Sequence, residues 1–93
     1  MIYCINRHEC VLDWMRNRGI VVDKLIRYFD ASIVKKGDIV IGNLPINIIG
    51  DVCNRGGRFF HFSYSVDGNK RDLTVDDLNK SKAYLKEYMV TSK

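Results

Sequence analysis

The sequence predicts a small three-layer α/β fold, in which one sheet lies between helices on both of its faces. Short apolar runs rich in β-forming residues alternate with segments whose apolar residues have helical spacing, in the order β-α-β-β-α-β-α. That alternation favours helices packed on a sheet. The length of 93 residues suits one hydrophobic core, so we expect residues 1–93 to form a single domain.

The first predicted helix has the plainest apolar spacing, because Val11, Trp14 and Met15 recur three and four residues apart before Gly19, which can end a helix. Pro45 suits the first position of a second helix, where its missing N–H costs nothing. In order, we predict a strand at 1–5, a helix at 8–18, strands at 24–29 and 38–42, a helix from Pro45 to Gly56-Gly57, a strand at 58–66, a loop at 67–69 and a helix at about 75–89.

The last helix has the clearest start signal. Thr74 is a good N-cap, and Asp77 stands three residues later, as in a capping box. Leu85, Tyr88 and Met89 then continue an apolar face at helical spacing. We therefore expect this helix to extend to about residue 89.

The connection between the second and third predicted strands is too short for a regular crossover. Residues 30–37 leave no room for a helix, and parallel neighbouring strands normally need a dozen or more connecting residues. The two strands are therefore either antiparallel or joined by a bare loop, and the sequence does not distinguish these arrangements.

Composition excludes several classes of protein. No stretch reaches the ~20 consecutive apolar residues that span a bilayer, and the apolar start of the chain breaks at residue 6, unlike a signal peptide. We expect a cytoplasmic protein without a membrane partner. Three cysteines without metal-ligand spacing predict reduced, mostly buried thiols, with neither a metal site nor a disulfide framework. The net charge of +4 mildly favours an anionic partner.

Two loops have the residues and position of a phosphate site. Residues 6–8 follow the first strand and residues 42–47 follow the third, and ligands of α/β sheets bind where strands give way to helices. Arg7 can grip a phosphate through two donors, and His8 can transfer a proton near neutral pH. Gly42 allows close approach of the backbone, whereas amides such as Asn43 suit a ribose or a base edge. Both loops could also be ordinary turns.

The aromatic residues have simpler interpretations. Alternation places His61 on the opposite face of its strand from Phe60 and Phe62, and we interpret it as a hydrogen-bonded structural histidine. Tyr84 and Tyr88 are interpreted as packing or interface residues.

Four segments, taken in order, also carry a resemblance. They are Asn6-Arg7-His8 with Trp14 and Gly19, then residues 37–47, then Val52-Cys53-x-Arg55-Gly56 with His61, and finally Arg71-x-Leu73-Thr74. Together they resemble a family of small CRISPR-associated proteins found with type III systems. Asn43 departs from that family's pattern, where a threonine is expected, so the role of this position is less defined.

The resemblance implies a Rossmann-like fold related to CARF domains and the activity of a ring nuclease. Such proteins act as homodimers and, without a metal or cofactor, cut a cyclic oligoadenylate such as cyclic tetraadenylate. This switches off the antiviral effectors that the messenger activates. In the cleavage, the ribose 2′-hydroxyl attacks the adjacent phosphate and leaves a 2′,3′-cyclic phosphate end.

That activity assigns roles to the two loops. Arg7 would neutralise the phosphate, and His8 would transfer a proton or only donate to the phosphate. The residues expected to bind the ligand are Asn6, Gly42, Asn43, Pro45, Ile46 and Asn47, with the backbone N–H groups of the last two facing a phosphate.

Two other functions stay open. The same fold could hold the messenger without cutting it, as a sensor or sponge, and only product analysis separates this from cleavage. A general RNA- or DNA-binding protein would need a basic stripe with exposed aromatics, whereas residues 59–62 look like core, so long nucleic acid is not an expected partner.

Overall fold

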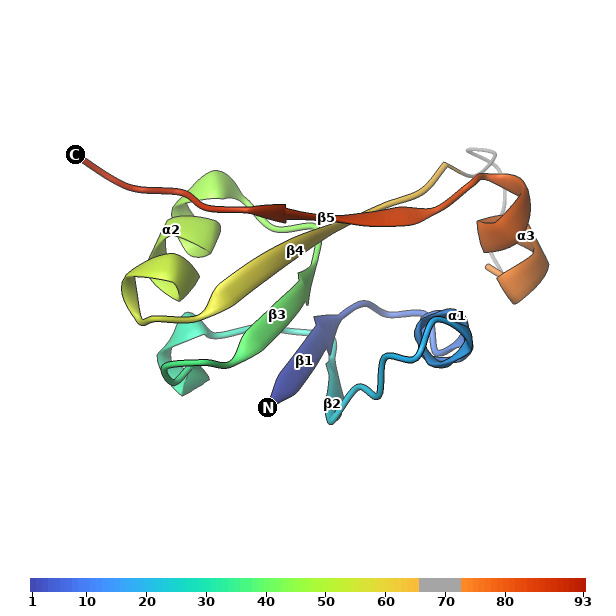
Figure 1. The fold of residues 1–93 in the computed structure, drawn as a ribbon, viewed down its shortest axis with the longest axis horizontal. Coiled ribbons are helices and arrows are strands. Elements are labelled where there is room, and N and C mark those ends of the chain that lie inside the picture. The colour runs from blue at the N-terminus through green and yellow to red at the C-terminus, as the bar shows by residue number, and fades with distance from the viewer. Residues whose placement is uncertain (66–72) are drawn as a thin grey trace.

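The computed structural model describes residues 1–65 and 73–93, and these form a mixed five-stranded sheet in the order β2-β1-β3-β4-β5 (Figure 1). The first four strands are mutually parallel, and β5 runs antiparallel to β4 at one edge. The predicted loop at 67–69 lies outside the described residues. The elements are β1 (Ile2–Ile5), α1 (Cys10–Asn17), β2 (Lys24–Ile26), the 3₁₀ helix η1 (Ala31–Ile33), β3 (Ile39–Gly42), α2 (Ile46–Asn54), β4 (Arg58–Ser63), α3 (Val75–Lys80) and β5 (Tyr84–Tyr88).

Helices cover both faces of the sheet, as predicted. Helices α1 and α3 lie together on one face, and α2 with η1 lies on the other (Figure 1). Each face has its own apolar core, so the architecture is a three-layer α/β sheet, compatible with a small Rossmann-like fold. The core on the α1 face comprises Cys4, Val11, Trp14, Met15, Ile41, Phe62, Leu78 and Ala83. The core on the α2 face comprises Tyr3, Ala31, Val34, Val40, Ile49, Val52 and Phe59.

The second and third strands are not neighbours, which resolves the question of their connection. Both pair in parallel with β1, on its opposite sides, so the antiparallel alternative is wrong. The link between them holds only the short helix η1, which Asp30 caps by accepting a hydrogen bond from the Ser32 N–H at 2.9 Å. This link therefore resembles a bare loop, which was the second arrangement that the sequence allowed.

The predicted long C-terminal helix is wrong beyond residue 80. The capping box forms as expected, with the Asp77 N–H donating to Thr74 Oγ1 at 3.2 Å and the Thr74 N–H donating to Asp77 Oδ2 at 2.9 Å. The helix ends at Lys80, Lys82 adopts a left-handed φ of 56°, and the chain continues as β5. The edge of β4 offers a full ladder of backbone partners, and pairing with it prevails over the weak helical spacing.

Several boundaries also differ from the predictions. Helix α1 spans Cys10–Asn17 rather than 8–18, and β4 ends at Ser63 rather than at residue 66. Strand β2 ends at Ile26, so residues 27–29 are not part of it. Pro45 has φ −59° and ψ 149° and is the N-cap of α2, one position before its first helical residue. Within the described part of the chain, no helix is both long and apolar enough to cross a membrane.

Candidate functional site

The order of the strands creates a crevice between β1 and β3. The chain leaves β1 toward α1 on one face, and it leaves β3 toward α2 on the other face. Connections that diverge to opposite faces open a crevice at the carboxyl ends of the two strands, and open α/β sheets bind their ligands in such crevices. The two loops that the sequence singled out both begin at this point.

A cavity of about 320 Å³ occupies this end of the sheet. Its lining comes from the carboxyl ends of three adjacent strands, β1, β3 and β4, and includes polar groups from each. The structure thus brings together three of the residues expected to bind a ligand, Asn6, Gly42 and Asn43, although they come from two separate loops. The complete lining is Ile5, Asn6, Gly42, Asn43, His61, Phe62, Ser63 and Tyr64.

Asn6 is held firmly at the mouth of this cavity. Its backbone N–H donates to the Ile26 carbonyl at 3.1 Å, which ties the end of β1 to the end of β2. Its side-chain Oδ1 accepts a hydrogen bond from the His8 N–H at 2.8 Å, a local turn that directs the chain into α1. Asn6 therefore both shapes the turn and lines the cavity.

Arg7 and His8 lie beside this cavity and are not among its lining residues. Arg7 is exposed and His8 is half-buried, and the Arg7 Nε donates a hydrogen bond to His8 Nε2 at 3.3 Å. Because Nε2 accepts this hydrogen bond, it carries no proton, and a neutral imidazole in this arrangement has its proton on Nδ1. The pair that the sequence assigned to catalysis is thus engaged with itself at the start of α1.

A second cavity, also about 320 Å³, adjoins the first on the α2 face. It is an apolar groove between α2 and β5 with β4 beneath it, and we call it the α2–β5 groove. Of the remaining predicted ligand-binding residues, Ile46 lines this groove, whereas the exposed Pro45 and Asn47 line neither cavity. The residues of the α2–β5 groove are Leu44, Ile46, Ile49, Phe59, His61, Tyr88 and Val90.

His61 lines both cavities and is the residue that sequence reasoning undervalued. It lies on the α2 face, opposite Phe60 and Phe62, as alternation predicted. Among the described residues its imidazole has no hydrogen-bond partner, so the interpretation as a hydrogen-bonded structural histidine is wrong there. The imidazole lies perpendicular to the Tyr88 ring, with the two ring centres 6.2 Å apart. Its place at the cavities depends on β4 being parallel to β3, which the sequence alone does not state.

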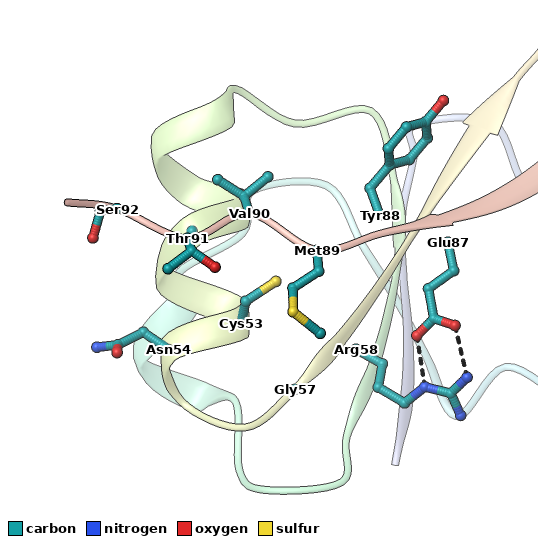
Figure 2. A pocket seen from close by; sticks show the side chains of 11 residues that line it. Cys53, Asn54, Gly57, Arg58, Glu87, Tyr88, Met89, Val90, Thr91 and Ser92 are labelled. Carbon is teal, nitrogen blue, oxygen red and sulfur yellow. Dashed lines mark hydrogen bonds and ion pairs between the residues drawn. The ribbon is translucent and has the colours of Figure 1, made fainter.

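A third cavity, of about 290 Å³, adjoins the α2–β5 groove, with which it shares Tyr88 and Val90, and has no lining residue in common with the first cavity (Figure 2). It is enclosed by the C-terminal half of α2, the amino end of β4 and the chain after β5, which passes over α2. At its edge Arg58 and Glu87 form a two-pronged ion pair, with donor–acceptor distances of 2.8 and 2.9 Å, and the hydrogen bond from Arg58 lowers the pKa of Glu87. No residue that the sequence predicted to bind a ligand lines this cavity.

The cysteines show no sign of a shared site. Cys4 is buried and desolvation raises its pKa to about 11, so it is an unreactive thiol at neutral pH. Cys10 and Cys53 are half-buried, and burial also raises the pKa of Cys10. In the described ranges, 1–65 and 73–93, no group of three or more histidine, cysteine or acidic side chains could hold a metal ion.

Comparison with known proteins assigns the chain to a family. Residues 3–91 match the model of the family described as "Putative CRISPR-associated protein (Cas_VVA1548)". No curated protein and no solved structure matches the chain. The match extends over nearly every residue, including both loops at the carboxyl edge of the sheet and all three strands that line the polar cavity. The chain therefore belongs to this CRISPR-associated family.

Proposed function

We propose that this protein is a ring nuclease that binds and cleaves a cyclic oligoadenylate, with cyclic tetraadenylate as the first candidate. The observation that carries the proposal is the polar cavity at the carboxyl ends of β1, β3 and β4, because it joins the two loops that resemble those of ring nucleases. Membership of a CRISPR-associated family supports the same conclusion, since the cyclic messenger is made and read in that defence.

The proposed reaction needs positioning and a path for one proton. The ribose 2′-oxygen attacks the adjacent phosphorus, its proton leaves, and the bond from phosphorus to the 5′-oxygen breaks as that oxygen gains a proton. Arg7 neutralises the phosphate, His8 transfers a proton, and Asn43 holds the ribose or base. Such alignment and charge neutralisation account for most of the rate that metal-free cleavage requires.

The contact between Arg7 and His8 sets a condition on this mechanism. While His8 Nε2 accepts from Arg7 at 3.3 Å, its lone pair is not available to a 2′-hydroxyl. The terminal nitrogens of Arg7 have no hydrogen-bond or ion-pair partner among the described residues and can receive a phosphate first. Phosphate binding would then draw the guanidinium away and free His8 as the base.

The size of the cavity favours a homodimer. A volume of about 320 Å³ lies at the lower end of small-molecule sites, which run from about 300 to 1,000 Å³, and is too small for a ring of four nucleotides. A twofold dimer presents two such cavities related by the symmetry of the ring. We therefore propose two protomers per ring.

Binding without cleavage is the second candidate, and one observation favours it. Arg7 and His8 are engaged with each other and lie outside the polar cavity, so this conformation could hold an adenylate without supplying a base. A sensor or sponge of the same fold would have this arrangement.

The deciding experiment incubates the purified protein with cyclic tetraadenylate in excess EDTA and identifies the products by mass spectrometry. Linear adenylates with a 2′,3′-cyclic phosphate end would establish cleavage. An intact ring that binds in calorimetry would select the sensor or sponge, and an intact ring that does not bind would refute both. Undiminished turnover in Arg7→Ala or His8→Ala would overturn the role of that residue.

A further inference from the structure

We propose that the α2–β5 groove is a nucleobase subsite, which receives a purine base while the polar cavity holds the ribose and phosphate of the same nucleotide. The inference rests on the proposed function, because it supposes an adenylate ligand. It adds a binding surface and assigns a ligand contact to His61, which divides the two cavities.

The chemistry of the groove suits the flat face of a base. Its walls are aliphatic and aromatic, and of the described residues that line it His61 and Tyr88 carry a polar side-chain group. This combination of apolar walls with a small number of polar groups is usual for small-molecule sites. Two of the lining residues are left open to solvent, because Ile46 is 70% exposed and Tyr88 is 45% exposed. A stacked base would cover both.

The two cavities are joined in the way that one nucleotide requires. Asn43 lines the polar cavity and the next residue, Leu44, lines the groove, so the loop after β3 passes from one to the other. His61 forms the boundary on the β4 side. The base and the phosphate of a nucleotide are attached to different carbons of the ribose, so a nucleotide that fills both cavities puts its ribose between them, at His61 and at the loop.

The charge near the groove is also suitable. Lys86 is the cross-strand partner of His61, so both side chains are on the same face of the sheet. The Lys86 ammonium lies 5.5 Å from the centre of the Tyr88 ring. This cation stands close to the boundary where an anionic phosphodiester would enter. A purely apolar partner would gain nothing from it.

A second copy of the chain is the competing occupant of this face. A specific protein interface needs about 800 Å² from each partner, with a complementary shape. Here the groove is lined by seven residues, whereas a specific interface takes about 20–30 residues from each side. For this reason we favour the base.

The test titrates the full-length protein with adenosine 5′-monophosphate and, separately, with ribose 5-phosphate, and follows methyl and side-chain amide signals by NMR. We expect the nucleotide to shift the methyl signals of Ile46 and Ile49 together with the amides of Asn6 and Asn43, and ribose 5-phosphate to shift only the amides. Amide shifts without methyl shifts from the nucleotide would overturn the base subsite and leave the proposed function intact. Methyl shifts that follow protein concentration rather than ligand would overturn it in favour of a second copy.

A matched pair of variants gives an independent readout. Ile46→Ser removes an apolar wall, and Val21→Ser makes the same change at a residue that is 74% exposed and lines neither cavity. We expect Ile46→Ser to weaken binding of cyclic tetraadenylate about tenfold, with binding of ribose 5-phosphate unchanged. Equal affinity in the two variants would overturn the inference. Failure of the ring to bind to the unaltered protein would instead refute the proposed function.

Discussion

Substituting Gly42 with alanine tests whether the polar cavity depends on the close approach of β1 and β3. Gly42 is the last residue of β3 and is buried. A Cβ atom there would lie 3.2 Å from both the Cβ and the carbonyl oxygen of Ile5 on β1. Neither atom can rotate away, because both are fixed by the pleat of the sheet. The strands would have to separate by a few tenths of an ångström.

The expected cost follows from two opposing effects. An alanine restricts the unfolded chain and so stabilises the protein by about 0.4–1 kcal/mol, whereas overpacking between two strands costs about 1–3 kcal/mol. We therefore expect Gly42→Ala to lower the free energy of unfolding by about 1–2 kcal/mol and the melting temperature by about 4–8 °C for each kcal/mol. The displacement separates Asn6 from Asn43, so binding of cyclic tetraadenylate should weaken about tenfold.

Gly50 provides the matched control. It lies within α2, and a Cβ there would meet only the Val90 Cγ1 at 3.6 Å, an ordinary contact. Gly50→Ala should therefore stabilise the protein by about 0.5–1 kcal/mol and leave binding unchanged. Urea unfolding followed by the fluorescence of the single tryptophan, Trp14, measures both variants, and calorimetry measures binding. Equal stability and equal affinity in the two variants would refute the reasoning.

Three further substitutions test the fold. Trp14→Phe should lower the free energy of unfolding by less than about 1 kcal/mol, measured by urea unfolding followed by circular dichroism. It removes a buried indole N–H that has no hydrogen-bond partner among the described residues, and such an N–H itself costs about 1–3 kcal/mol. Hydrogen bonds from the Lys35 N–H and then from the N-terminal ammonium hold the pKa of Asp38 below its usual value. The stabilisation by the Asp38 carboxylate is therefore present above an unfolded pKa of about 3.9 and is lost as pH falls through the folded pKa. Between pH 5 and 3, the urea midpoint should fall less steeply in Asp38→Asn than in the unaltered protein. Thr74→Ala should cost about 1 kcal/mol in thermal unfolding, and Thr74→Ser much less.

The last helix and strand show which signals in this sequence are local. The start of α3 was predictable, because a capping box involves only residues three apart. Its end was not, because Tyr84 and Tyr88, four residues apart, fit one face of a helix as well as one face of a strand. Residues 84–88 form a strand because they pair with the free edge of β4, which lies more than twenty residues earlier in the chain. Short apolar runs are ambiguous until their partner is known.

In the candidate site, too, local features could be predicted from the sequence and long-range ones could not. Both loops could be found from the sequence, because each follows a recognisable apolar strand and precedes a helix. Their meeting at one cavity depends on β1 and β3 being adjacent, although β2 separates them in the chain. His61 was missed because its place at that cavity requires β4 to be parallel to β3, and an aromatic run alone does not state its direction.

The positions of the two histidines relative to the polar cavity decide which of them can transfer a proton in the proposed reaction. The chain has two histidines. His8 is two residues from Asn6, yet the turn closed by Asn6 Oδ1 carries it out of the cavity and into contact with Arg7. His61 is fifty-three positions further along, yet it lines both cavities, and its imidazole has no hydrogen-bond partner in the described part of the chain. In the proposed reaction, cleavage through His8 therefore requires Arg7 to release its imidazole, whereas His61 can contact a ribose where it already lies.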